Sequence, residues 1–272
     1  MARDTQHQKL KVTSNEINHQ YGDKVHILSS PLMLSLLAKL GHPQTHQPQI
    51  NELTEMLYSY LIDNVIDVLF PRKLAQVETR MKSSHPEASY EGEIVDPEVR
   101  CVSVDLARAG TFPSHLCYNK LNYLMNPELV RQDHFYVARL TDEKGQVTGV
   151  NVSGSKIGGD VKDSIVLFPD PMGATGGTIV QAYNHYLNEL GARPRLMVAM
   201  HLIITPEYLK KVTTLCPDLH IFALRLDRGL STADVLNEVP GKKWSDEKGL
   251  NQHQYIVPGA GGLGEILNNS YC

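Results

Sequence analysis

One stretch of the sequence combines a carboxylate, hydroxyls and glycines at a spacing that suits phosphate chemistry. Residues 164–178 read Ser-Ile-Val-Leu-Phe-Pro-Asp-Pro-Met-Gly-Ala-Thr-Gly-Gly-Thr. The apolar run 165–168 predicts a buried strand, which the prolines on either side of Asp170 terminate. The glycines allow a tight loop, and Thr178 is expected to cap a helix that runs to Gly191. We therefore predict a strand, a loop and a helix whose exposed N–H groups can bind a phosphate.

The spacing excludes two common phosphate-binding motifs. No lysine follows the glycines, so the P-loop of nucleoside triphosphatases is absent, and so is the Gly-x-Gly-x-x-Gly dinucleotide pattern. A carboxylate at a strand tip, shortly before a Thr-Gly-Gly-Thr turn, can accept hydrogen bonds from sugar hydroxyls while the turn holds a phosphate. The pattern therefore favours a ribose 5-phosphate lying across the end of a sheet. The alternative is a glycine-rich turn that only connects strand to helix.

Three segments resemble motifs of one enzyme family. Residues 170–178 are similar to the phosphoribosyl pyrophosphate (PRPP) loop of uracil phosphoribosyltransferases, and Arg-Ala-Gly at 108–110 is similar to their pyrophosphate loop. Residues 249–259, Gly-Leu-Asn-Gln-His-Gln-Tyr-Ile-Val-Pro-Gly, resemble their uracil-binding segment. The similarity is clear from Val102 to the C-terminus and loose before it. The resemblance implies an enzyme of pyrimidine salvage that transfers ribose 5-phosphate from PRPP to N1 of uracil, giving UMP and pyrophosphate.

The resemblance also implies a role for each matching residue. Asp170 would bind the ribose hydroxyls and stabilise the positive charge at C1. The leaving pyrophosphate would be neutralised by Mg²⁺, held mainly by the substrates, and by Arg108, Arg139 and Lys156. The PRPP site would comprise Arg108, Ala109, Gly110, Asp170, Met172, Gly173, Ala174, Thr175, Gly176, Gly177 and Thr178. The uracil site would comprise Tyr255, Ile256, Gly261, Gly262 and Leu263.

The sequence departs from the family pattern in three places. The family's uracil segment ends in Gly-Leu-Gly-Asp-Ala-Gly-Asp, but Gly262 replaces the first aspartate, which helps to place Mg²⁺, and Glu265 replaces the last. The lid arginine aligns with Arg139 only after a shift of register and otherwise with Thr141. Ser153 stands where the family often has a tyrosine before the lid lysine. Two alternatives therefore stay open: a PRPP-dependent transferase for another nucleobase, and a non-catalytic PRPP or UMP sensor.

The composition predicts a soluble, cytoplasmic protein. A chain of 272 residues, 42% of them hydrophobic, can bury the core of one domain. The polar start is unlike a signal peptide, and the longest apolar run, 196–204, is too short to span a bilayer. Four widely spaced cysteines without a Cys-x-x-Cys pair suggest a reducing compartment. The formal net charge of −4 predicts no general attraction to nucleic acid. Besides PRPP and uracil, the implied partner is a second copy of the chain, in a homodimer or larger homo-oligomer.

The remaining sequence alternates between helix-like and strand-like patterns. Apolar residues recur at helical spacing in 30–41 and 50–70, and prolines mark the ends. Further predicted strands are 100–105, 135–139, 196–204 and 221–226. This alternation predicts an open, mainly parallel α/β sheet flanked by helices, as in type I phosphoribosyltransferases, with the ligand at the carboxyl ends of the strands. His201, within an apolar strand, is expected to be a hydrogen-bonded core residue rather than a catalyst.

The chain is expected to form a single domain, residues 1–272, with three parts. The first part is a helical N-terminal region at residues 1–90. The second is a core with a small hood, at 91–229 and 249–272. The third is an insertion at 230–248, next to the base segment. The glycine- and charge-rich residues 141–159 are longer than an ordinary connection. We expect them to form a mobile lid, because closure would protect a glycosyl cation from water.

Overall fold

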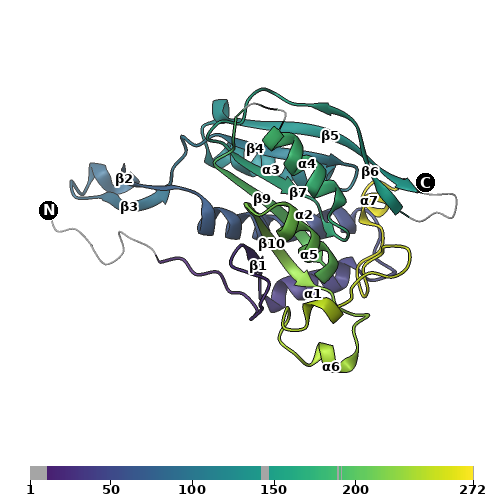
Figure 1. Ribbon diagram of the computed structural model, residues 1–272. Helices are drawn as coiled ribbons and strands as arrows, with labels where there is room; N and C mark the ends of the chain where they lie inside the picture. The colour runs from purple at the N-terminus through teal and green to yellow at the C-terminus, as the bar shows by residue number, and fades with distance from the viewer. Residues whose placement is uncertain (1–10, 142–146, 189, 191, 272) are drawn as a thin grey trace.

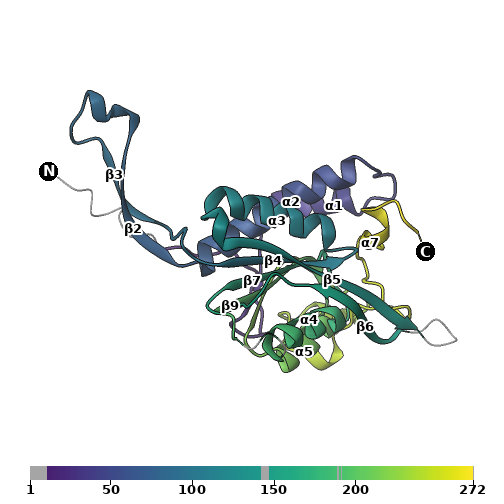
Figure 2. The same ribbon diagram turned by 90° about the horizontal axis from the view of Figure 1, so that it is seen from above.

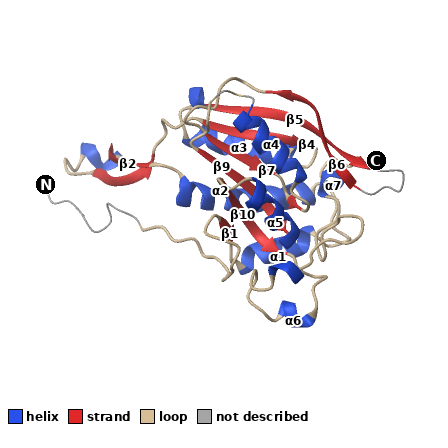
Figure 3. Ribbon diagram, viewed as in Figure 1, coloured by secondary structure: helices blue, strands red, loops and turns tan. Residues whose placement is uncertain are grey.

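The computed structural model describes residues 11–141, 147–188, 190 and 192–271. Within these residues eight strands form the main sheet in the order β1-β10-β9-β7-β4-β5-β6, with the short β8 beside β9 (Figure 3). Neighbouring strands are parallel except for β5 and β6. The strands are β1 Val25–Ile27, β4 Cys101–Ala107, β5 Val130–Thr141, β6 Val147–Lys156, β7 Ile165–Pro169, β8 Met172–Gly173, β9 Leu196–Ile204 and β10 Leu219–Leu226. The predicted open, mainly parallel sheet is thereby confirmed.

Helices cover both faces of the sheet, as Figures 1 and 2 show. One face carries α1 Pro31–Leu40, α2 Gln49–Leu69 and α3 Thr111–Leu124, and the other carries α4 Gly177–Asn188 and α5 Pro206–Leu215. Each interface encloses its own buried hydrophobic cluster. Leu57 and Leu121 pack in the cluster under α1–α3, whereas Tyr186 and Tyr208 belong to the cluster under α4 and α5. The sheet is therefore buried on both faces, which explains its continuous apolar strands.

Local signals at the ends of the elements explain why several predicted boundaries are correct. Ser30 caps α1 and accepts a hydrogen bond from the Met33 N–H, and Thr205 caps α5 in the same way. Both helices have proline in the first turn, where its missing N–H costs nothing. The helix after the glycine loop begins at Gly177, so Thr178 lies in its first turn and is not the cap. Its predicted end, Gly191, lies outside the described residues.

The N-terminal region contains strands as well as the two predicted helices. The short β1 forms the edge of the main sheet next to β10. Strands β2 Arg72–Glu78 and β3 Ser89–Val95 pair as an antiparallel hairpin that projects from the body, with η1 Arg80–Ser83 near its tip (Figures 1 and 2). The expectation of a helical region was therefore wrong for these strands. A three-residue strand shows no period, and the hairpin, with exposed side chains on β2 and mostly half-buried ones on β3, lacks the alternation that burial imposes.

The predicted lid is largely a second strand. β5 is longer than expected and pairs antiparallel with β6, which occupies much of the region expected to be a loop. Residues 142–146 of the expected lid lie outside the described residues. Ala107 at the end of β4 pairs with Tyr136, so the later part of β5 extends beyond the carboxyl end of β4 as a small hood. Glycine and serine in β6 made its sequence resemble a loop.

The insertion at 230–248 is a closed loop at the edge of the body. It contains α6 Ala233–Leu236 and η3 Trp244–Asp246 and lies at the bottom of Figure 1. The Leu230 N–H donates to the Lys248 carbonyl at 3.0 Å, which closes the loop at its base. The buried Glu247 carboxylate accepts hydrogen bonds from Tyr21 and Arg228, so this end is tied to the N-terminal segment. Throughout the described segments, no helix is long and apolar enough to span a membrane.

Candidate active site

The site lies where the order of the strands reverses. From the central β4 the chain moves to β5 on one side, and it then returns through β7 to β9 and β10 on the other side. The loops that follow β4 and β7 therefore diverge and leave a crevice at the carboxyl ends of the strands. A cleft of about 570 Å³ lies there, with Arg108 after β4 and Asp170 after β7 in its lining.

Most of the predicted site residues line this cleft together. They are Arg108, Ala109, Asp170, Met172, Ala174, Thr175, Gly176, Gly177, Thr178, Tyr255, Ile256, Gly261, Gly262 and Leu263. Gly110 and Gly173 are not in the lining. A Cβ atom at Gly110 would lie 2.9 Å from the Pro169 carbonyl oxygen, and one at Gly173 would lie 2.7 Å from Ile204 Cγ2. Close packing behind the cleft therefore requires these two glycines.

Arg139 and Lys156 are also absent from the described lining. The backbone of Arg139 lies in the hood, where it pairs with Val150, and its side chain is outside the description. Lys156 is exposed at the end of the edge strand β6 and pairs with His134, while Asp105 is the β4 partner of the same histidine. Lys156 therefore lies two strands away from β4, at the level of Asp105. The turn at 108–110 lies beyond this level, toward the carboxyl end of β4. Contact of either residue with pyrophosphate stays a prediction.

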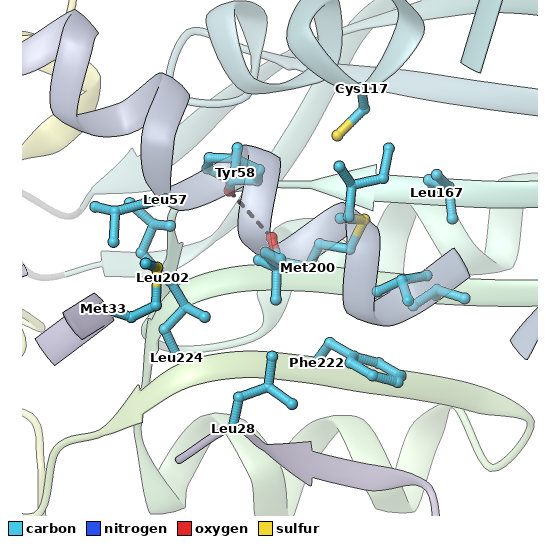
Figure 4. Packing of buried hydrophobic residues seen from close by; sticks show 14 of the residues in the cluster. Leu28, Met33, Leu57, Tyr58, Cys117, Leu167, Met200, Leu202, Phe222 and Leu224 are labelled. Atoms are coloured by element: carbon cyan, nitrogen blue, oxygen red, sulfur yellow. Dashed lines mark hydrogen bonds between the residues drawn. The ribbon is translucent and has the colours of Figure 1, made fainter. Parts of the chain in front are cut away.

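Two hydrogen bonds fix the backbone of Asp170, and a third, from α2, holds the Met200 carbonyl that accepts one of them. Its N–H donates to the Met200 carbonyl at 3.1 Å, and the Tyr58 hydroxyl of α2 donates to the same carbonyl at 3.1 Å (Figure 4). The Asp170 carbonyl lies 2.5 Å from His201 Nδ1. The half-buried carboxylate accepts the Met172 N–H at 3.3 Å, a long hydrogen bond. The backbone at the strand tip is therefore held in place, and Asp170 lines the cleft.

His201 is the core residue that the sequence predicts. It is fully buried, and its Nε2 lies 2.6 Å from the Tyr208 hydroxyl. Because a carbonyl can only accept, Nδ1 carries the proton toward Asp170, and Nε2 accepts from Tyr208. Burial lowers the pKa of His201 from 6.5 to about 4, although the hydrogen bond to the Asp170 carbonyl acts in the opposite direction. The imidazole is therefore neutral near pH 7 and positions the Asp170 backbone.

The glycine loop is held from behind by β9 and α5. Met172 and Gly173 pair with the end of β9 as the short strand β8. Thr205 then donates its hydroxyl to the Ala174 carbonyl at 2.8 Å. Gly176 has φ of +76°, and a Cβ atom there would lie 2.7 Å from Val212 Cγ2. The loop shape thus requires glycine at 176 for folding.

The turn after β4 contacts the C-terminal segment. Arg108 is exposed and donates to the Ser270 carbonyl at 3.0 Å and to its hydroxyl at 2.7 Å. The short helix α7, Leu263–Ile266, packs on the same turn, since a Cβ atom at Gly264 would lie 3.4 Å from Ala109 Cβ. The predicted pyrophosphate turn and the predicted uracil segment are therefore neighbours, although more than half of the chain separates them in sequence.

The predicted uracil segment is anchored by acids that sequence reasoning did not identify. The Glu207 carboxylate, in the first turn of α5, accepts the N–H groups of Gly249 at 2.9 Å and Leu250 at 3.1 Å. Asp227 accepts the Gly259 N–H at 2.8 Å and is paired with Arg225. From the sequence alone, an acid in the first turn of a helix is explained by its favourable interaction with the helix dipole. Nothing in the sequence connects Glu207 with the uracil segment, which begins about 40 residues later. Tertiary structure alone assigns Glu207 this role.

The oxygen donors of the cleft fit Mg²⁺ that is held largely by a substrate. Two carboxylates, those of Asp170 and Glu265, line it. In the described part of the chain, no group of three or more histidine, cysteine, aspartate or glutamate side chains could hold a metal ion. Mg²⁺ commonly takes one or two protein carboxylates, keeps several waters and relies on substrate phosphates. The residues present therefore fit this ion and do not form a metal cage of their own.

Comparison with known proteins agrees with this geometry. The family model described as "Uracil phosphoribosyltransferase" matches residues 27–241. The chain belongs to this family. The uracil phosphoribosyltransferase of Campylobacter concisus is 25% identical over 246 residues, covering 90% of this chain and 98% of the relative. That of Shouchella clausii is 25% identical over 250 residues, covering 90% of this chain and 97% of the relative.

A solved structure shows the same fold. The AQ2163 protein from Aquifex aeolicus aligns with a TM-score of 0.65 and 21% identity, covering 90% of this chain and 97% of that chain. The uracil phosphoribosyltransferase family and the type I phosphoribosyltransferase fold, both inferred from the sequence, are therefore confirmed. The family match begins within β1, so it extends over the N-terminal helices, where the motifs are only loosely similar.

Proposed function

We propose that the protein transfers ribose 5-phosphate from PRPP to N1 of uracil and releases UMP and pyrophosphate. The observation that carries this proposal is the meeting of three segments in one cleft. A carboxylate at the tip of β7, a glycine loop at the start of α4 and a backbone-rich segment at 255–263 all line it. Membership of the uracil phosphoribosyltransferase family supports both the donor and the acceptor.

The loop and Asp170 would bind the ribose phosphate. Thr175, Gly176, Gly177 and Thr178 line the cleft at the start of α4, and their backbone N–H groups and hydroxyls would suit the 5-phosphate. The Asp170 carboxylate would accept hydrogen bonds from the ribose hydroxyls. As the bond to pyrophosphate breaks, positive charge develops at C1, and this fixed negative charge would stabilise it.

The turn after β4 would bind the pyrophosphate. Arg108 and the backbone of Ala109 line the cleft next to α7, and an arginine forms strong, charge-assisted hydrogen bonds with phosphate oxygens. Bound Mg²⁺ would supply additional neutralisation of the leaving pyrophosphate. To bind the ligand, Arg108 would have to give up its two hydrogen bonds to Ser270 and form new ones to the phosphate oxygens. The side chains of Arg108 and Ser270 are both exposed, which allows this rearrangement.

The segment at 255–263 would recognise the base through its backbone. Gly261 has φ of +77°, a conformation that exposes backbone groups without a side chain in the way. Uracil presents an N–H donor between two carbonyl acceptors, whereas cytosine presents a different pattern. Each mispaired buried polar group costs about 1–3 kcal/mol, which corresponds to roughly a tenfold or hundredfold preference for uracil.

A chromatographic assay of PRPP and saturating Mg²⁺ with a panel of nucleobases tests the proposal. We expect UMP and pyrophosphate with uracil, and much slower turnover of cytosine. Faster turnover of another base would favour the runner-up, a PRPP-dependent transferase of different base specificity. PRPP binding without product from any base would instead support a non-catalytic sensor.

The structure weakens the argument for a transferase that acts on another nucleobase. That argument rests on residues 230–248, the insertion that adjoins the base segment in sequence. All of these residues are described, and none lines the cleft. The insertion closes on itself through the Leu230–Lys248 hydrogen bond and packs on the N-terminal segment through Glu247. We therefore propose that it supports the base segment from outside.

The projecting β2–β3 hairpin favours a homodimer or larger homo-oligomer. It exposes apolar side chains away from the body, with Leu74 65% exposed, Val77 50% and Met81 53%. Exposed apolar groups gathered on one element usually mark a contact with another molecule. We propose a second copy of the chain as that molecule.

We also propose a cytoplasmic location. Cys101, Cys117 and Cys216 are buried free thiols, and burial raises the pKa of Cys101 to about 12. Unpaired thiols are typical of proteins in a reducing compartment.

A further inference from the structure

The lining of the cleft contains a second carboxylate besides that of Asp170. Glu265 lies in α7 and lines the cleft, next to the turn that bears Arg108. α7 packs directly on that turn, because Gly264 approaches Ala109 closely. Glu265 is therefore placed beside the predicted pyrophosphate position, whereas Asp170 lies beside the ribose position.

The side chain of Glu265 folds back over Gly262. A Cβ atom at Gly262 would lie 2.8 Å from Glu265 Oε2 and 3.4 Å from its Cδ, with Tyr255 Cε1 at 3.7 Å. The backbone at Gly262 has φ of −81°, which any residue adopts, so no conformational strain requires glycine there. The space over Gly262 is instead filled by the Glu265 carboxylate.

The Glu265 carboxylate has no protein partner among the described residues. The hydrogen bonds of Glu265 involve its backbone: its N–H donates to the Gly262 carbonyl, and its carbonyl accepts from the N–H groups of Asn268 and Ser270. The side chain is half-buried, so its charge is partly withdrawn from water without compensation. A pyrophosphate next to it would be repelled unless a cation lay between the two groups.

We propose that Glu265 positions the Mg²⁺–pyrophosphate part of PRPP, and that its carboxylate takes the place of the acid that the sequence lacks at Gly262. The proposal rests on the proposed transferase function. An acid three residues along the chain reaches the same space because its longer side chain folds back through one helical turn. Glycine at 262 is then a requirement, since any side chain there would displace the carboxylate. The missing aspartate is accordingly not a sign of a lost metal contact.

Titration calorimetry of PRPP binding at a series of Mg²⁺ concentrations tests this role. Glu265→Gln keeps the shape of the side chain and removes its charge. We expect the Mg²⁺ concentration for half-maximal PRPP affinity to rise about tenfold. Glu128→Gln is the matched control and should leave this concentration unchanged, because Glu128 is an exposed acid in η2 Pro127–Leu129, just before the amino end of β5. Electron paramagnetic resonance of bound Mn²⁺ with PRPP should show weaker binding in Glu265→Gln and unchanged binding in Glu128→Gln.

A second variant addresses the space over Gly262. Gly262→Ala adds only a Cβ atom, at a permitted φ, and should shift the same Mg²⁺ dependence without lowering the melting temperature. PRPP binding to Glu265→Gln with the Mg²⁺ dependence of the wild type would overturn the proposal. A wild-type protein that binds no PRPP at any Mg²⁺ concentration would instead refute the transferase function. The two failures are therefore distinguishable.

Discussion

Replacement of Asp170 by asparagine separates a catalytic role from a structural one. The change keeps the size of the side chain and removes its negative charge. In the structure the backbone of Asp170 is held by Met200 and His201, and both hydrogen bonds are independent of the carboxylate. We expect Asp170→Asn to retain the fold and to lose most of the transfer activity.

The structure allows both effects to be bounded. The carboxylate accepts the Met172 N–H at a long 3.3 Å, and an amide oxygen can accept the same hydrogen bond. The loss in free energy of unfolding should therefore be below about 1 kcal/mol. Loss of a fixed group that stabilises transition-state charge typically costs about 3–4 kcal/mol, so the rate of transfer should fall roughly 100- to 1,000-fold.

Two measurements on the same samples decide the matter. Urea unfolding gives the stability, and the rate of UMP formation gives the activity. Asp67→Asn, an exposed position on α2, serves as the control and should change neither. Asp170→Asn with near-normal turnover would refute the assignment, and so would a variant that is inactive only because it unfolds.

Three other predictions follow from the packing behind and around the cleft. Gly176→Ala should lower the free energy of unfolding by about 2–5 kcal/mol, because φ is +76° and the new Cβ atom would meet Val212 Cγ2 at 2.7 Å. Val212→Ala in the same chain should recover part of this loss in urea titrations. A double variant whose loss equals the sum of the two single losses would contradict the contact. Because the pKa of His201 is lowered to about 4 in the folded protein, the unfolded chain binds more protons between pH 6.5 and about 4. The contribution of neutral His201 to the free energy of unfolding is therefore full above pH 6.5. It falls by about 3 kcal/mol as the pH drops to about 4. Urea unfolding across this pH range should show a smaller decrease in the free energy of unfolding for His201→Gln than for the wild type. Equal decreases would show that His201 is not the titrating group. Leu74→Ser with Val77→Ser should reduce the assembled mass in sedimentation without changing the melting temperature, and an unchanged mass would exclude the hairpin as the contact.

The strands that are buried on both faces could be predicted from the sequence, whereas exposed strands could not. The strand at 196–204 is continuous in apolar residues, and its predicted bounds agree with β9. The segments that form β2, β3 and β6 have exposed or polar residues, so no periodic burial distinguishes them from loops. Burial on both faces leaves a local signal in the residue types, and pairing at an exposed edge leaves very little.

The sequence by itself determined the family, the glycine loop and the strand tip that carries Asp170, because each is encoded by a few adjacent residues. Only the tertiary structure decided which residues share the cleft. Gly110 and Gly173 serve packing, Lys156 lies on an edge strand, and Glu265 folds over Gly262. These outcomes depend on the register of strands and on helix packing between segments far apart in the chain. Local sequence patterns specify backbone shape and burial, but they do not specify the distances between such segments.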